Sequence, residues 1–232
     1  MTREPLDTRV TNGRFVGPDA PASSILTIHD GKIVDAPGED VWRTVNASGH
    51  LVLPGLIQPS ATDLDSALTA IRGGVTTAIA SIHDDSTSCL DAVAISEVAI
   101  QIIEIDGSNE LSDREWDLLG RDEPVHVQAA AGSGFPIIHF LYHEGHIKRS
   151  LPLHRLAALT SGNIARELGI FPQKGSFAAG SDGDVVVFDP KGDDPYSDIA
   201  WPGRVIFSLL RGSILLYNGQ IHTSAGDGMR VR

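Results

Sequence analysis

The sequence is poor in basic side chains and in cysteine. Its 232 residues include 18 lysines and arginines, only four of them lysine, against 30 acidic residues, so the net charge is −12. Nucleic acids and anionic membranes are bound by basic stripes, so we expect neither as a partner. The single cysteine, Cys89, excludes an intramolecular disulfide and fits a reducing compartment. We therefore expect a cytoplasmic protein.

Long apolar runs are also missing. The first residues contain no apolar stretch of signal-peptide length, and no later segment approaches the roughly 18 uninterrupted apolar residues of a membrane span. At about 150 residues per domain, the chain is long enough for one or two domains with a real core. Its 41% hydrophobic residues and 24 glycines are typical of a globular protein.

Both ends of the sequence predict short strands joined by turns. The pairs Asp30-Gly31 and Asn218-Gly219 stand between β-branched or apolar runs, and each predicts a two-residue hairpin turn. The predicted terminal strands are 14–16, 25–28, 32–34, 184–189, 205–210, 213–217 and 220–221.

The middle of the sequence predicts an α/β arrangement. Residues 49–57 are apolar on both faces, as in a buried strand, with a bend at Pro54-Gly55; a helix over 63–71 and a strand over 75–82 follow. A further buried strand is predicted over 99–105. Two helices are predicted over 135–144 and 153–168, the second interrupted at Thr160-Ser161 and closed by Gly169.

Several motifs, in a fixed order, carry a resemblance to a known family. The N-terminal motifs are Asn12-Gly13-Arg14, Asp30-Gly31-Lys32-Ile33-Val34, Leu53-Pro54-Gly55-Leu56-Ile57 and Arg72-Gly73-Gly74-Val75-Thr76-Thr77. The C-terminal ones are 159–166, Gly169-Ile170-Phe171-Pro172-Gln173-Lys174-Gly175, 180–190 and 211–213. Together they resemble the cyclic amidohydrolases, the group of dihydroorotases, hydantoinases or dihydropyrimidinases, and allantoinases.

The resemblance implies a metal-dependent hydrolase of cyclic amide bonds, with a β-sandwich built from both termini beside a TIM-like barrel. We therefore predict an α/β plus β fold, with a composite sandwich from 1–53 and 175–232 and a barrel remnant over 54–174. A complete barrel takes roughly 250 residues, more than the whole chain. We expect about three strands to remain: the first, the second, and 100–105 as the eighth, with strands three to seven missing between roughly Asp85 and Val98.

The metal ligands that the resemblance implies are absent from the sequence. The family's first strand ends in a His-x-His pair, and the aligned positions are Ser60 and Thr62. A carboxylated lysine is expected in the missing strands, and no lysine occurs between Lys32 and Lys148. The last ligand, an aspartate that is also the general base, aligns with Asn109, whose amide cannot take up a proton. We predict no catalytic residue, cofactor or metal, and treat Ser60, Thr62 and Asn109 as vestigial positions.

Other polar groups offer an alternative site. His139, His143 and His146 stand at i, i+4 and i+7, which would place three imidazoles on one face of a regular helix as a zinc clip. The competing interpretation has the apolar neighbours buried and the histidines solvated or at a subunit contact. The segment His83-Asp84-Asp85 ends a predicted strand, where it is interpreted as a polar remnant, and Cys89 is interpreted as a structural thiol.

Removal of strands from a barrel leaves sheet edges and apolar faces that a stable protein must cover. The leading hypothesis is therefore a non-catalytic amidohydrolase-like subunit that forms a homo-oligomer or a hetero-oligomer with a full-length amidohydrolase. The alternative is a metal-dependent hydrolase of cyclic amides or ureides with an unconventional zinc site. A third hypothesis, a decayed remnant, is disfavoured because the strand and turn chemistry of the two ends is intact.

Overall fold

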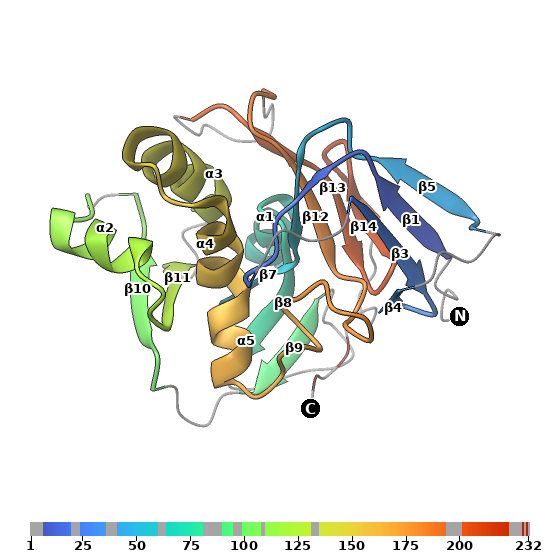
Figure 1. Ribbon diagram of the computed structural model, residues 1–232, viewed down its shortest axis with the longest axis horizontal. Helices are drawn as coiled ribbons and strands as arrows, with labels where there is room; N and C mark the ends of the chain where they lie inside the picture. Colours follow the sequence, from blue (N-terminus) through green and yellow to red (C-terminus); the bar gives the residue numbers. More distant parts are fainter. Residues whose placement is uncertain are drawn as a thin grey trace.

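The computed structural model describes residues 7–19, 24–35, 41–59, 64–80, 90–94, 99–107, 110–130, 135–193, 201–222, 229 and 231. Two sheets built from both ends of the chain lie on one side of the molecule, and the helices and the remaining strands lie on the other (Figure 1). Within the described residues, no helix is both long and apolar enough to cross a membrane.

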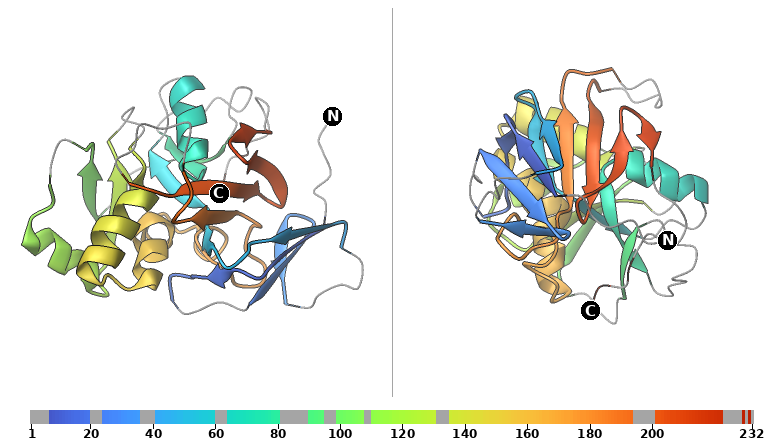
Figure 2. Two further views of the ribbon diagram at one scale, coloured as in Figure 1. Left: turned by 90° about the horizontal axis from the view of Figure 1, so that it is seen from above. Right: turned by 90° about the vertical axis from the view of Figure 1, so that its right-hand side faces the viewer.

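The two terminal sheets form the composite sandwich expected from the sequence. The first has the order β4-β3-β1-β5, with β1 (Thr8–Thr11), β3 (Ile25–His29), β4 (Lys32–Val34) and β5 (Arg43–Asn46). The second has the order β15-β14-β13-β12-β6-β2, with β2 (Arg14–Phe15), β6 (Leu51–Pro54), β12 (Val185–Asp189), β13 (Arg204–Leu210), β14 (Ser213–Tyr217) and β15 (Gln220–Ile221). Figure 2 shows the N-terminal strands beside the C-terminal ones.

One apolar cluster fills the space between these two sheets. It contains Val10, Ile28 and Ile33 from the first sheet and Val52, Val185, Val187 and Leu209 from the second. The predicted hairpin turns are confirmed: both residues of Asp30-Gly31 and of Asn218-Gly219 have positive φ, as a two-residue hairpin turn requires.

The remaining strands are parallel and fall into two groups. One sheet has the order β7-β8-β9, with β7 (Leu56–Pro59), β8 (Val75–Ala80) and β9 (Asp91–Ala94). The other pairs β10 (Gln101–Ile105) with β11 (Val125–Ala129). Helix α1 (Leu64–Arg72) joins β7 to β8, and α2 (Asp113–Gly120) joins β10 to β11, so each forms a βαβ unit.

Strand β8 pairs with β7 and β9, and β10 pairs with β11. The sequence prediction for these strands is wrong in two respects. Within the described residues five parallel strands are present where about three were predicted, and β9 lies inside the interval assigned to a deletion. Strand β10 is buried on one face only, since Gln101, Ile102 and Glu104 are exposed.

The helices near the C-terminal half follow the sequence prediction closely. Their segments are α3 (Ile137–Phe140), the π-helical η1 (Leu141–Ile147), α4 (Leu153–Ala157), the π-helical η2 (Ala158–Gly162) and α5 (Asn163–Glu167). The interruption predicted at Thr160-Ser161 is the π-helical turn η2, where both side-chain hydroxyls donate to the main-chain oxygen four residues earlier. Gly169 has φ +70° and ends the helix.

The chain passes from the sandwich to the parallel sheet at Gly55, between β6 and β7. Its main-chain N–H donates to the Asp184 main-chain oxygen at 3.1 Å. A Cβ added at Gly55 would lie 2.0 Å from Thr76 Oγ1, and that hydroxyl donates to Asp184 Oδ2 at 3.3 Å. The crossing therefore requires a residue without a side chain.

We predict that Gly55→Ala lowers the free energy of unfolding by about 1–3 kcal/mol, because the added methyl group displaces Thr76 from a packed crossing. Urea unfolding measures the loss. Gly120→Ala is the matched control, since no atom lies within 4 Å of its added Cβ and its φ needs no glycine; it should leave stability unchanged or slightly raised. Equal effects of the two substitutions would contradict this account.

Candidate functional site

The vestigial ligand positions Ser60, Thr62 and Asn109 lie outside the described residues, as do His83-Asp84-Asp85 and Cys89. Gln58, two positions before Ser60 on β7, is among the described residues and is only 5% exposed.

The Gln58 side chain links two strands. Its Nε2 donates to the Val127 main-chain oxygen at 3.2 Å, and its Oε1 accepts from the Ala129 main-chain N–H at 2.9 Å. It thus bridges β7 to β11, two strands that are not paired through their main chains. Sequence reasoning missed this role, although a lone amide in an apolar buried strand was its signal.

The three histidines of the alternative zinc site each contact a different main-chain oxygen. The contacts are His139 Nε2 to Gly203 O at 2.8 Å, His143 Nε2 to Pro202 O at 2.7 Å and His146 Nδ1 to Leu151 O at 2.8 Å. Two of these acceptors follow one another in the segment before β13, beside Trp201, whose Nε1 donates to Glu144 at 2.9 Å. His139, His143 and Glu144 therefore hold that segment against the helix.

The segment that carries His143 and His146 is not a regular α-helix. Residues 141–147 follow i→i+5 hydrogen bonding, with more residues per turn than the α-helix on which the i, i+4, i+7 spacing rests. Within the described part of the chain, the three ring nitrogens are not among the groups whose ligand atoms gather within 4.8 Å. His139 is also 1% exposed, so the solvated interpretation is wrong for this residue.

Among the described residues, the group whose possible ligand atoms lie within 4.8 Å of one another is Asp7, His29 and Asp30 on the sandwich. His29 Nδ1 lies 2.9 Å from Asp7 Oδ2, and its Nε2 lies 3.5 Å from Asp30 Oδ2. The hydrogen bond to Asp7, followed by the charges of both carboxylates, raises the pKa of His29. An imidazolium has no lone pair for a metal, so this arrangement favours an ion pair over a metal site.

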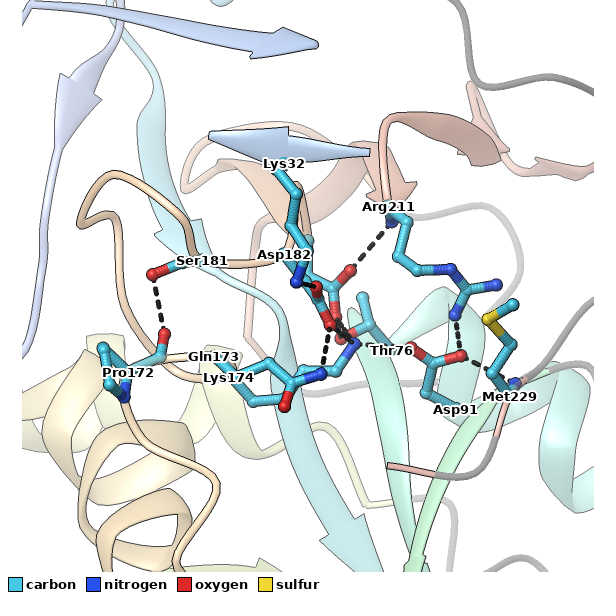
Figure 3. A network of polar contacts seen from close by, with 11 residues as sticks. Lys32, Thr76, Asp91, Pro172, Gln173, Lys174, Ser181, Asp182, Arg211 and Met229 are labelled. Carbon is cyan, nitrogen blue, oxygen red and sulfur yellow. Dashed lines mark hydrogen bonds and ion pairs between the residues drawn. The ribbon is translucent and has the colours of Figure 1, made fainter. Parts of the chain in front are cut away.

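The ammonium group of Lys174 is deeply buried. Its side chain is 1% exposed, and Nζ lies 2.5 Å from Asp91 Oδ2, 2.9 Å from Asp182 Oδ2 and 2.7 Å from Asp184 Oδ2 (Figure 3). The three carboxylates match the three N–H donors of an ammonium group. Lys174 therefore sits at the centre of a buried network, which we call the Lys174 network.

Two further cations complete the Lys174 network. Arg211 Nη1 donates to Asp91 Oδ1, and Lys32 Nζ lies 2.5 Å from Asp182 Oδ1. Asp91 Oδ1 also accepts the Met229 main-chain N–H at 2.8 Å. With three cations against three carboxylates, the charges balance. The network joins the sandwich, strand β9, the 173–184 segment and the C-terminal residues.

The electrostatics of the network keep the lysine charged. Burial alone would lower the pKa of Lys174, but the charges of Asp184, Asp91 and Asp182 outweigh it, so the pKa lies above its usual value. Burial alone would raise the pKa of Asp182, but the charges and hydrogen bonds of Lys174 and Lys32 outweigh it and lower that pKa. At Asp184 the effect of burial is larger than that of Lys174, so the pKa of this carboxyl is raised.

This electrostatic setting decides what the buried lysine can do. A lysine that acts as a nucleophile or base needs a lowered pKa and a free electron pair. Lys174 has a raised pKa, and carboxylates surround its ammonium group. The arrangement is suited to holding segments together and not to amine chemistry.

We predict that Lys174→Met lowers the free energy of unfolding by about 3–5 kcal/mol, because three carboxylates lose their shared buried cation. Urea unfolding at neutral pH measures the change. Lys32→Met is the matched control: the Lys32 side chain is 46% exposed, and its loss should cost no more than about 1 kcal/mol. A Lys174→Met protein within 1 kcal/mol of the wild type would refute the structural role of this network.

A second buried titratable group lies on β11. His126 is fully buried, and its Nδ1 lies 2.8 Å from the Leu159 main-chain oxygen of η2. Because a carbonyl oxygen only accepts, Nδ1 carries the proton. Burial lowers the pKa of His126 to about 4, so the imidazole is neutral at neutral pH.

This depressed pKa predicts acid sensitivity with a defined sign. The unfolded chain takes up a proton at His126 below pH 6.5, whereas the folded chain does so only near pH 4. The stabilising contribution is therefore complete above pH 6.5 and is lost as the pH falls toward 4, by at most about 3 kcal/mol. At pH 7 the wild type should unfold at a higher urea concentration than His126→Gln, and the two midpoints should approach each other as the pH falls toward 4. A difference independent of pH would contradict this assignment.

Known proteins relate to this chain in both sequence and fold. A D-phenylhydantoinase of Escherichia coli O1:K1 is 32% identical over 106 residues, and an allantoinase of Rubrobacter xylanophilus is 35% identical over 106 residues. Each match covers 40% of this chain and 23% of the relative, so the chain matches about a quarter of the relatives' length. No family model matches the chain.

The fold is similar over nearly the whole chain. An L-hydantoinase (dihydropyrimidinase) structure from Arthrobacter aurescens superimposes with a TM-score of 0.69 at 14% identity, covering 97% of this chain and 99% of that one. The described sheets and helices are thus those of an amidohydrolase fold. Sequence matches and fold together confirm the resemblance drawn from the motifs: the chain is similar in sequence to cyclic amidohydrolases over 106 residues and similar in fold over nearly its whole length.

Proposed function

We propose that this chain is a non-catalytic member of the cyclic amidohydrolases that acts as an assembly subunit, joining a second copy of itself or a full-length amidohydrolase. The observation that carries the proposal is the sequence at the end of β7. Where the family's metal-binding imidazoles are expected, the chain has Ser60 and Thr62. Hydroxyl groups do not hold a catalytic zinc that lowers the pKa of a bound water.

The contacts of the described polar residues support the proposal. Gln58 forms hydrogen bonds with the main chain of β11, and His126 Nδ1 donates to the Leu159 main-chain oxygen. His139 and His143 are engaged with the segment before β13. These polar groups make contacts that hold elements together, which is what a retained scaffold without a reaction centre requires.

An incomplete barrel accounts for the parallel strands. The strands β7-β8-β9 and β10-β11, with Gln58 between β7 and β11, make an ordered set of five where a closed barrel has eight. Strands at the two ends of such a set present open edges, and open edges promote association. The proposal therefore places the function in assembly. With one cysteine and a strongly acidic composition, we place that assembly in the cytoplasm.

We predict that the purified chain does not hydrolyse 5-phenylhydantoin or allantoin, with or without added Zn²⁺ or Mn²⁺, because it lacks the ligands that activate water. Ring opening followed spectrophotometrically, beside a D-phenylhydantoinase as positive control, tests this. Turnover that needs added zinc and disappears in His139→Ala or His143→Ala would instead establish the alternative, a hydrolase with an unconventional zinc site.

A further inference from the structure

Strand β10 is an open edge. It pairs with β11 on one side, and no strand within the described residues pairs with its other side. Gln101, Ile102 and Glu104 are exposed, with Ile102 at 40%, and β10 lies at the outer end of the molecule (Figures 1 and 2). A two-stranded sheet is marginal by itself, and parallel strands are normally part of larger sheets.

The hydrogen bonding of β10 shows which main-chain groups face outward. The Ile105 main-chain oxygen accepts from the Ala130 N–H at 2.9 Å, so residue 105 points its main-chain groups toward β11. Successive residues of a strand point these groups to alternate sides. The N–H and C=O groups of Ile102 and Glu104 therefore point away from β11, which leaves four main-chain groups on the open edge.

We infer that this edge pairs with β10 of a second copy of the chain about a twofold axis. The inference rests on the proposed assembly role and names its surface. A twofold axis makes the pairing antiparallel and self-complementary. With Ile103 on the axis, Ile102 lies opposite Glu104 of the partner subunit as a hydrogen-bonded pair. This register uses all four outward groups of each copy, and the result is a four-stranded sheet.

The side chains of β10 fit a second copy in that register. On the exposed face, the aliphatic stem of Glu104 lies against Ile102 of the other copy, so carboxylates do not face each other directly. On the opposite face, Ile103 lies against its own counterpart. Ile103 already belongs to the apolar core formed with Trp116 and Leu119, so the cores of the two copies become continuous.

The salt dependence of association distinguishes a second copy of the chain from a basic partner. Two chains of charge −12 repel each other, and salt screens that repulsion. The homodimer should therefore tighten between 0.05 and 0.5 M NaCl, whereas association with a basic partner would weaken.

Disulfide trapping tests the register directly. In a non-hydrogen-bonded antiparallel pair the Cα atoms are about 4.5 Å apart, within the range that a disulfide spans. In a Cys89→Ser background, Ile103→Cys should form a covalent dimer on mild oxidation. Ile105→Cys, on the same face, is the matched control: it lies four positions, roughly 13 Å, from its counterpart and should not cross-link.

A proline variant tests the hydrogen bonds. The Glu104 N–H points outward, so Glu104→Pro leaves the pairing with β11 intact while removing one bond from each copy. The dimer dissociation constant, measured by analytical ultracentrifugation, should rise more than tenfold. Glu104→Gln keeps the N–H and removes a charge, so it should dimerise at least as tightly as wild type. Circular dichroism checks that both variants fold, and Ile102→Glu, at an exposed position, gives an independent disruption.

The outcomes separate this surface from the broader proposal. Equal cross-linking of Ile103→Cys and Ile105→Cys, or an undiminished dimer in Glu104→Pro and Ile102→Glu, overturns the β10 interface while leaving assembly through another surface. A wild-type chain that is monomeric at 0.5 M NaCl and high micromolar concentration overturns the interface and self-assembly together. Hydrolytic turnover removes the non-catalytic proposal without bearing on the interface.

Discussion

The ammonium group of Lys174 holds together segments that are far apart in the sequence. Its carboxylate partner Asp91 comes from the edge strand β9, 83 residues earlier, and Asp182 and Asp184 come from the segment that enters β12. Arg211 and the Met229 main chain reach the same Asp91 carboxylate. Because a buried charge without its partners costs several kcal/mol, each of these segments depends on the others for its place. The short sheet β7-β8-β9 is thereby fixed against the sandwich.

Polar side chains also join separate elements elsewhere in the fold. Gln58 joins β7 to β11 through a side-chain amide, and His139 and His143 hold the segment before β13 through its main-chain oxygens. In each case a polar side chain contacts main-chain groups of another element. A fold similar to that of hydantoinases is in this way held together by hydrogen bonds and ion pairs among its own residues, and β10 remains as the edge through which we propose that it assembles.

The sequence predicted the features that depend on local chemistry. The Asp30-Gly31 hairpin and the helix end at Gly169 follow from positive φ values that few residues accept, and Gly55 stands where Thr76 leaves no room for a side chain. The strands β9 and β11 were missed because four or five residues carry too weak a period to separate from a loop. The Lys174 network was missed because its members have no sequence spacing in common. The histidine clip was predicted from an α-helical period, and the π-helical turns of η1 removed that period.

We propose that the folded chain is held together by its own buried network and folds without a metal ion. Metal linkage tests this proposal most directly, because an ion that binds only the folded state raises the free energy of unfolding by RT ln(1 + M/Kd), where M is the free metal concentration. The urea midpoint should be the same after dialysis against EDTA and in the presence of 0.1 mM Zn²⁺ or Mn²⁺. A midpoint that rises with metal concentration, and falls again on chelation, would show a metal site in the native chain and contradict the account.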